Sequence, residues 1–381
     1  MSLPPVMHNE ISRRSWLAMA VTTLAACGGG GGGVAGLPGT GGTGIYAQGS
    51  IAGFGSVIVN SVKYDDTQAK VQIDGVAATS ADLRLGMVAE VQGQRGTDPT
   101  LGTASSIVVW SIGQGRITQV QSGQFTLAGM IIQTDSGTVF DGLANAATLA
   151  TGQRVSVWGL QSGTDGLHWT ATRVAITSNT TVLVVTGMVT VVGSQRYVNN
   201  TLLSGAGVSA LVAGQWVRVQ GTLSGSTWQV SNLQVLDANT GPVLQGEAEI
   251  EGVVTSVLSK TSFLLGNIEV DASSAAVASA LAKITVGARI EVNGTWQGRV
   301  LKAAEISLED DDSIQKVEIE AAIQQFTSIA HFVVRGQVCN ASATPGLSSS
   351  TLAKLKVGTK VKIEGVKNGD VVMVTKLELS S

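Results

Sequence analysis

The stretch "ITVGARIEVNG", residues 284–294, decides the fold because both of its features recur along the chain. Gly287 follows a short helical or turn segment, where a left-handed cap is best made by glycine. After it, the apolar residues Ile290 and Val292 alternate with polar ones, which is the pattern of a strand with one buried face. The second glycine, Gly294, is expected to end this strand and to open a hairpin.

The same eleven-residue pattern occurs five times, which indicates a tandem array of one structural unit. The copies are "LRLGMVAEVQG" (83–93), "LATGQRVSVWG" (149–159), "LVAGQWVRVQG" (211–221), "ITVGARIEVNG" (284–294) and "LKVGTKVKIEG" (355–365). On the polar face of the predicted strand, one equivalent position holds Glu90, Ser156, Arg218, Glu291 and Lys362.

The elements around the fourth copy predict the whole unit. They are strands at 247–258, 262–266 and 268–272, a helix at 273–284, and strands at 288–296 and 300–308. A long first strand, and a helix between the third and fourth of five strands, describe a small barrel like the OB fold. In the first copy the helix shrinks to "SADLRL", so a single turn is expected there. A five-bladed propeller is the alternative, but propeller blades have no inserted helix.

We therefore predict an all-β fold with short helices, made of five tandem OB-like small β-barrel repeats of about 65 residues. The predicted parts are a signal peptide at 1–27, a glycine-rich tether at 28–44, and repeats 1 to 5 at 45–112, 113–180, 181–241, 242–310 and 311–381.

The N-terminal segment has the anatomy of an export signal: the pair Arg13-Arg14, a short apolar run, and small residues before Cys27. It resembles a bacterial lipoprotein signal, because Leu24-Ala25-Ala26-Cys27 matches the lipobox. That resemblance implies lipidation of Cys27 and a membrane anchor. "SRRSWL" also resembles a twin-arginine motif, so export by the twin-arginine route and export by the general route both remain open. In lipoproteins of this kind, an Asp directly after the cysteine retains the protein in the inner membrane. Gly28 occupies that position here, so the resemblance implies sorting to the outer membrane and a place in the periplasm or at the cell surface.

The repeats resemble those of an exported bacterial family of unknown function, DUF5666. The resemblance is carried by "GSIAGFGSVIVNSVKYD" (49–65) and by the five copies of the glycine pattern. It implies a module and a location, and no established chemistry.

Composition limits the classes of partner. A formal net charge of −3, with only 13% charged residues, provides no basic field for nucleic acid or anionic lipid. The two cysteines, Cys27 and Cys339, lie at opposite ends of the chain and make no disulfide framework. Cys339 is expected to be a buried, inert thiol. No apolar stretch in the repeats reaches the length of a membrane-spanning helix.

No catalytic or metal-binding constellation emerges from the residue types. His8 falls in the signal segment, and His168 and His331 fall in different repeats, so no repeat holds a histidine pair. The acidic run "EDDD", 309–312, lies at a junction between repeats and is expected to be a solvated linker rather than a calcium site. We expect no catalytic residue, no metal and no cofactor.

Two tryptophans are candidates for binding. Trp158 and Trp216 fall on the face opposite the core valines, where they could bind a sugar ring or a base, or pack against a neighbouring barrel. We expect a non-catalytic binding or structural role in the cell envelope, with a glycan or protein as the possible partner. The alternatives are carbohydrate or adhesive binding through aromatics, nucleic-acid binding, and an enzyme. An enzyme would require a polar cluster with perturbed ionisation between repeats.

Overall fold

The computed structural model describes residues 44–178, 182–236, 244–310, 313 and 315–380. The predicted signal segment, Cys27 and the tether up to residue 43 lie outside this described part. All described residues fall within one compact unit, Gly33–Ser381. Among them, no helix has both the length and the apolar character needed to cross a membrane.

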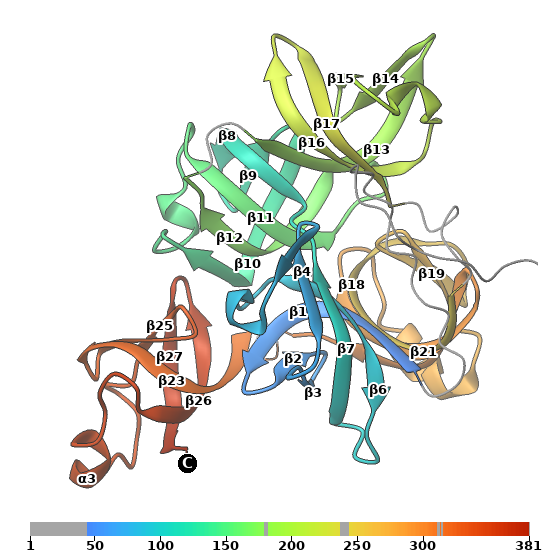
Figure 1. Ribbon diagram of the computed structural model, residues 1–381. Helices are drawn as coiled ribbons and strands as arrows, with labels where there is room; N and C mark the ends of the chain where they lie inside the picture. The colour runs from blue at the N-terminus through green and yellow to red at the C-terminus, as the bar shows by residue number, and fades with distance from the viewer. Residues whose placement is uncertain (1–43, 179–181, 237–243, 311–312, 314, 381) are drawn as a thin grey trace, which may run out of the picture. The chain divides into compact units, whose positions relative to one another are not determined.

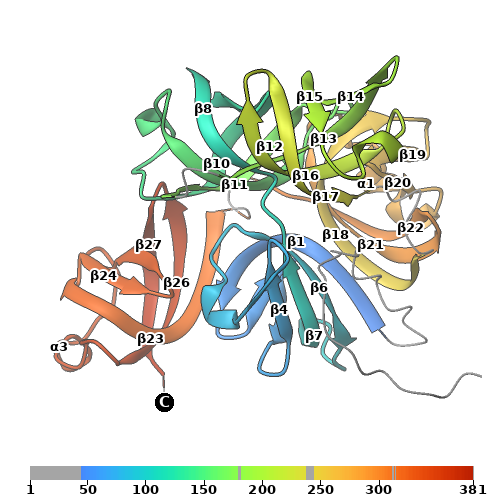
Figure 2. The same ribbon diagram turned by 45° about the horizontal axis from the view of Figure 1, so that its top comes forward.

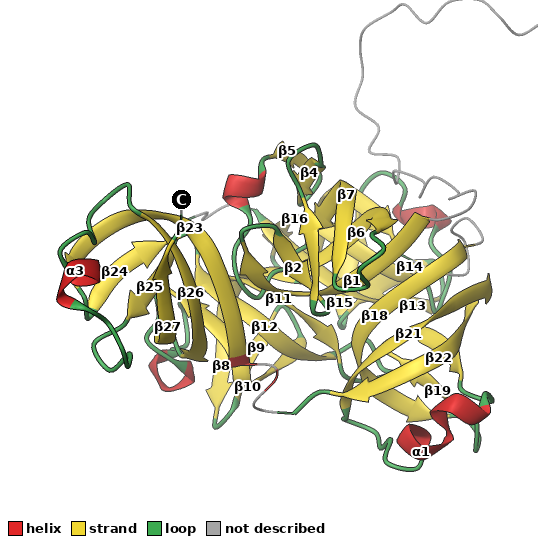
Figure 3. Cartoon of the chain, turned by 90° about the horizontal axis from the view of Figure 1, so that it is seen from below, coloured by secondary structure: helices red, strands yellow, loops and turns green. Residues whose placement is uncertain are grey.

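Repeat 4 shows the architecture most simply. Its strands are β18 (Leu244–Val257), β19 (Ser262–Leu265), β20 (Ile268–Asp271), β21 (Arg289–Gly298) and β22 (Val300–Leu308). Neighbouring strands pair antiparallel except β20 and β22, which pair parallel, and β21 returns to β18 to close the barrel. The order 1-2-3-5-4-1 is that of an OB-like barrel. The predicted helix is present but short, as 3₁₀-helix η4 (Ala275–Val277) followed by α1 (Ala278–Leu281) (Figure 3).

The other four repeats close in the same way (Figure 1). Repeat 1 has β1 (Gly44–Phe54), β2 (Val57–Val59), β3 (Val62–Asp65), β6 (Val88–Arg95) and β7 (Leu101–Val109), plus the hairpin β4 (Lys70–Ile73) and β5 (Val76–Ala78). Repeat 2 has β8 (Gly113–Gln121), β9 (Gln124–Leu127), β10 (Met130–Asp141), β11 (Arg154–Gln161) and β12 (His168–Ile176).

Repeat 3 has β13 (Leu183–Val192), β14 (Gln195–Val198), β15 (Thr201–Ser204), β16 (Trp216–Ser224) and β17 (Thr227–Val235). Repeat 5 has β23 (Lys316–Ser328), β24 (His331–Val334), β25 (Gln337–Asn340), β26 (Lys360–Asn368) and β27 (Val371–Leu379). The short helices before the fourth strand are η1 (Ser80–Asp82), η2 (Ala146–Thr148), η3 (Val208–Ala210) and α3 (Ser349–Leu352). The protein is thus all-β, with five tandem OB-like barrels.

The first strands of different repeats pair with one another. β1 pairs parallel with β18 along one part of its length and parallel with β23 at Gly53 and Phe54, and β8 pairs antiparallel with β13. Figure 2 shows β1 running beside β18. The buried apolar side chains follow this grouping. The cores of repeats 1 and 5 join in one cluster, those of repeats 2 and 3 in a second, and repeat 4 forms a third.

The two glycines of the repeated pattern have different structural roles. The first is left-handed as expected, with φ of +91° at Gly287. The second does not end the strand: β21 continues through Gly294 to Gly298. The strand pairing shifts register between Asn293 and Gly294. A Cβ at Gly294 would lie 2.2 Å from the carbonyl oxygen of Lys302 on β22, so this bulge requires glycine. The equivalent bulge glycines are Gly93, Gly159, Gly221 and Gly365.

A matched pair of substitutions in repeat 4 separates these two roles. Gly294→Ala places a methyl group against a backbone carbonyl, so we expect a loss of about 3 kcal/mol of unfolding free energy. The methyl group of Gly287→Ala would meet no atom within 4 Å. Its only cost is the left-handed backbone conformation, so we expect a loss of about 1 to 2 kcal/mol of unfolding free energy. Urea unfolding followed by circular dichroism measures both, and an equal or smaller loss for Gly294→Ala would contradict the close approach.

Candidate functional site: the contacts between repeats

The structure places both candidate tryptophans between repeats. Trp158 on β11 and Trp216 on β16 are only 6% and 8% exposed. The Trp216 ring meets Trp169 of repeat 2 edge to face, with centroids 6.0 Å apart. Trp158 belongs to the buried cluster formed mainly by repeats 1 and 5. Of the two expectations for these residues, the structure therefore agrees with packing between barrels and leaves neither ring on an open surface.

Beside Trp158, an arginine holds a turn of repeat 1 against repeat 2. The buried guanidinium of Arg173 donates from Nη1 to the carbonyl oxygen of Leu85 at 3.1 Å and pairs with Asp141. Burial lowers the pKa of Arg173 to about 10, although Asp141 opposes the shift. A Cβ at Gly86 would lie 2.4 Å from the carbonyl oxygen of Thr172, so the two backbones are in direct contact here.

The polar position shared by the five fourth strands supplies several of the charged groups at these contacts. Arg218 pairs with Asp74 of repeat 1. Lys362 lies 3.1 Å from Glu318, which also accepts a hydrogen bond of 2.7 Å from Lys63 of repeat 1. The alternation of apolar and polar residues identified this position as polar. It did not indicate that another repeat covers the polar face of the strand.

Arg218 is the centre of the contact between repeats 3 and 1. Only 4% of Arg218 is exposed, and its Nη2 donates to Asp74 Oδ1 at 2.6 Å while its Nε donates to the carbonyl oxygen of Ser111 at 3.0 Å. The Ser111 amide donates to the same Asp74 oxygen at 2.8 Å. The guanidinium carbon lies 5.1 Å from the ring centroid of Trp110. Burial lowers the pKa of Arg218, and the charge of Asp74 opposes that shift.

A carboxyl pair lies between repeats 4 and 1. Glu249 on β18 is 3% exposed and accepts a 2.6 Å hydrogen bond from Nη2 of Arg95 in repeat 1. Burial, followed by the neighbouring Glu249, raises the pKa of Glu291 to about 9. The pKa of Glu249 is also raised by burial. The Tyr64 hydroxyl beside them is buried and has no hydrogen-bond partner, and burial and Glu249 raise its pKa.

Next to this pair, a third glutamate, Glu251, forms an ion pair with Arg289. Glu251 accepts hydrogen bonds of 2.6 Å from both the Ser50 amide and Nε of Arg289. Burial alone would raise the pKa of Glu251, but Arg289 and the Ser50 amide overcome it and hold the pKa below its usual value. Arg289 Nη1 also lies 3.7 Å from Asp135 Oδ2 of repeat 2. Residues from three repeats therefore meet around one guanidinium.

Repeats 5 and 2 meet at a buried lysine. Lys367 on β26 donates from Nζ to the carbonyl oxygen of Gly137 at 3.0 Å, and burial lowers its pKa to about 8. Backbone bonds continue this contact, with the Phe140 amide donating to the carbonyl oxygen of Gly369 at 3.3 Å.

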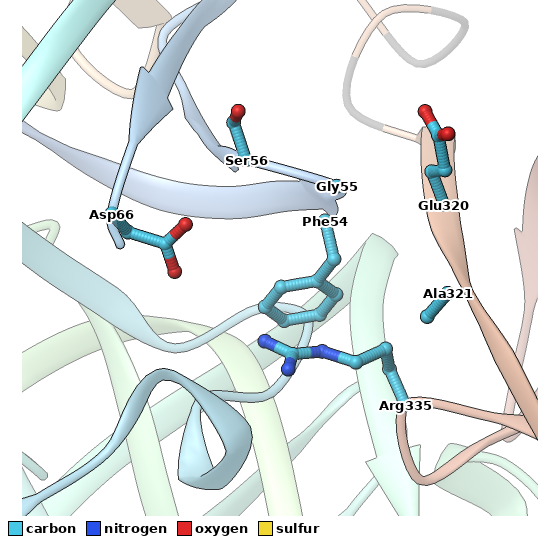
Figure 4. A pocket seen from close by; sticks show the side chains of 7 residues that line it. All are labelled: Phe54, Gly55, Ser56, Asp66, Glu320, Ala321 and Arg335. Carbon is cyan, nitrogen blue, oxygen red and sulfur yellow. The ribbon is translucent and has the colours of Figure 1, made fainter.

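A small pocket opens between repeats 1 and 5 (Figure 4). It is lined by Phe54, Gly55, Ser56, Asp66, Glu320, Ala321 and Arg335. The Arg335 guanidinium carbon lies 4.4 Å from the Phe54 ring centroid, and its Nη2 donates to the carbonyl oxygen of Ser80 at 2.5 Å. The volume of about 110 Å³ is well below the roughly 300 Å³ at which ligand pockets begin. The chain's own cation already covers the aromatic ring.

The remaining residues considered from the sequence lie apart from these contacts. Cys339 is fully buried, and burial raises the pKa of its thiol to about 12. His168 is half-exposed at the start of β12, where Nδ1 lies 2.7 Å from Asp165 Oδ2. Of the acidic run, Asp311 and Asp312 fall outside the described part. Within the described part, no cluster of three or more His, Cys, Asp or Glu side chains could hold a metal ion.

The strand order and closure define the class of the protein: a tandem array of OB-like barrels joined by their first strands. Two segments, 114–175 and 251–307, match the family described as a domain of unknown function, DUF5666, which confirms the predicted family for repeats 2 and 4. No curated protein matches the chain.

Among solved structures, a deletion mutant of the single-stranded DNA binding protein from Thermus aquaticus is similar at 15% identity. The match covers 34% of this chain and 82% of that chain, with a TM-score of 0.14. A likeness this weak carries no argument, and the assignment of the fold rests on the strand pairings alone.

The ion pair between Arg218 and Asp74 gives a measurable prediction. Arg218→Met leaves a partly buried carboxylate without its cation, so we expect a loss of about 2 to 3 kcal/mol of unfolding free energy. Lys376→Met, which breaks an exposed pair with Glu364 at 3.3 Å, should cost less than about 1 kcal/mol. Urea unfolding of both variants and of Asp74→Asn completes the comparison. Equal effects of Arg218→Met and Lys376→Met would show that the buried contact is not stabilising.

Proposed function

We propose that the protein is a lipid-anchored component of the bacterial cell envelope with a non-catalytic, structural role. Cys27 is the attachment point in this proposal, and the glycine-rich residues 28–43 connect it to the barrels. Export and sorting to the outer membrane, facing the periplasm or the cell surface, belong to the same proposal.

One observation carries the structural role. The faces that a free OB-like barrel could offer to a ligand are used here to join repeats. The first strands pair across repeats, and Arg218 on the fourth strand of repeat 3 pairs with Asp74 of repeat 1. Glu291 and Lys362, at the same position of repeats 4 and 5, lie against glutamates of their own repeats that pair with basic residues of repeat 1. Extensive contact between modules is expected of a protein that must keep a fixed form, rather than of modules that each bind separately.

The lipid anchor has a direct test. Cells that make the wild-type chain and are fed a labelled fatty acid should incorporate label into the protein, because the lipobox cysteine is the acceptor. Cys27→Ala should reduce that label to background. Cys339→Ala is the matched control, since it removes the other cysteine and should leave labelling unchanged. Equal labelling of wild type and Cys27→Ala would contradict the anchor.

Ligand binding through aromatics is the alternative. A sugar ring or base could reach Trp158 or Trp216 only if the contact between repeats opened, since both rings are covered. The carboxyl pair of Glu249 and Glu291 has the perturbed ionisation that an enzyme between repeats would need. Glu249 is too well covered for substrate to reach it, so we assign the pair to the contact between repeats.

Trp216 distinguishes a structural role from a binding role. Trp216→Ala should cost about 3 to 5 kcal/mol of unfolding free energy, because it removes a buried indole from the contact with Trp169. Leu223→Ala, at a 52% exposed position of the same strand, should cost little. A glycan and oligonucleotide array probed with both variants provides the second readout. Binding by wild type that Trp216→Ala abolishes without loss of stability would favour the alternative.

A further inference from the structure

Repeats 1 and 4 share a continuous sheet. Residues Ile45–Gln48 of β1 pair parallel with Glu247–Ile250 of β18, β1 pairs with β6 on its other edge, and β18 pairs with β21 on its other edge. The strand order across the two repeats is therefore β6-β1-β18-β21. Four pairs of facing strand residues join the two barrels in this sheet, whereas each barrel closes through its own strands. Separation of β1 from β18 therefore breaks no strand pairing within either barrel.

In the register of β1 and β18, side chains that point out of one barrel lie against the other barrel. Tyr46, which points away from the core of repeat 1, is opposite Ala248 in the core of repeat 4. Ala47 in the core of repeat 1 is opposite Glu249, which points away from the core of repeat 4. Tyr46 accordingly packs on the core of repeat 4, and Glu249 bonds to Arg95 of repeat 1.

The acidic groups at this contact outnumber the basic ones. The carboxyls are Glu90, Glu249, Glu251 and Glu291, and the guanidiniums are Arg95 and Arg289. Arg95 pairs with Glu249, and Arg289 pairs with Glu251. In the described structure, Glu90 and Glu291 have no basic side chain within ion-pair distance. A neutral contact thus requires both of these carboxyls to be protonated.

The surroundings of the two excess carboxyls favour that protonation. Burial raises the pKa of Glu90 to about 7, against an opposing hydrogen bond from Tyr46. Burial raises the pKa of Glu291 to about 9, and the carboxyls of Glu249, Glu309 and Glu251 add to the shift. Asn293 donates to Glu291 at 3.2 Å. The other ionisable groups facing this cluster are the phenols of Tyr46 and Tyr64, the carboxyls of Asp135 and Glu309, and the ammonium of Lys367.

We propose that the contact between repeats 1 and 4 is a proton-operated latch, closed while Glu90 and Glu291 carry their protons and loosened when they ionise. Ionisation adds up to two uncompensated negative charges to a covered contact that already holds two carboxylates. Mutual repulsion and the cost of covering an unpaired charge both act to separate the repeats.

The direction of the pH dependence follows from the raised pKa values. The stabilisation is complete below the ordinary glutamate value of 4.5 and is lost as pH rises through about 7 for Glu90 and about 9 for Glu291. Lys367 lies near Glu251 and Arg289, and its lowered pKa has the opposite effect. Loss of its proton above about pH 8 favours the folded form, so Lys367 does not cause the loosening.

Hydrogen–deuterium exchange of the full-length chain tests the latch. Peptides covering 44–50 and 244–252 report the shared sheet, and a peptide covering 262–271 reports a hairpin of repeat 4 with no strand pairing to another repeat. After correction for intrinsic rates, exchange in the two sheet peptides should be at least about tenfold faster at pH 9.5 than at pH 6, the change expected for one pKa unit of linkage. The hairpin peptide should not change.

Substitutions assign the effect to the two carboxyls. Glu90→Gln/Glu291→Gln should hold the sheet peptides protected at both pH values, and Glu291→Gln alone should retain only the step near pH 7. Glu269→Gln, at an exposed position of β20, should behave as wild type. The proposal is overturned if wild-type protection is the same at pH 6 and pH 9.5, if the double variant responds like wild type, or if the hairpin peptide loosens together with the sheet.

Discussion

The long first strand of each barrel is the constraint on which the rest of the structure depends. It pairs with the second and fourth strands of its own repeat, and part of its backbone is left with unpaired N–H and C=O groups. In this protein those edges pair with the first strands of other repeats. β1 does so twice, with β18 near its start and with β23 near its end. The requirement to satisfy backbone groups therefore links barrel closure to the joining of repeats.

Close pairing of strands explains the need for small residues at the joints. A Cβ at Gly53 would lie 2.2 Å from the carbonyl oxygen of Glu318, so the β1–β23 contact requires a glycine on β1. A Cβ at Gly49 would lie 1.9 Å from the Asn60 side chain, which itself donates to the carbonyl oxygen of Glu249 across the contact with repeat 4. Glycines within one strand thus determine which repeats can approach it.

The local pattern of the sequence predicts the barrels well and their joints poorly. The strands of repeat 4 lie within a few residues of their predicted bounds, because alternation and turn glycines are local properties. The same pattern wrongly predicted that Gly294 ends the strand. Gly294 instead forms a bulge, and a bulge depends on the partner strand, which the local pattern does not contain. The local pattern also did not reveal the hairpin of β4 and β5, because β4 pairs with β7, whose residues lie more than 30 positions further along the chain. Alternation shows that a strand has two faces, and it does not show what covers the second one.

That limit explains why Trp158 and the shared polar position were both ambiguous. An outer face in contact with water and one in contact with another barrel can carry the same residue types, because a covered polar group is stable once it finds a partner. The partners found here differ from repeat to repeat. Arg218 pairs directly with Asp74 of repeat 1. Lys362 and Glu291 lie against glutamates of their own repeats, and those glutamates pair with basic residues of repeat 1. Apolar side chains would hold barrels together more strongly but would let any two repeats associate. Distinct charges at one equivalent position give each contact its own set of partners, and in the proposed latch a carboxyl beside a carboxyl makes the contact between repeats 1 and 4 depend on a proton.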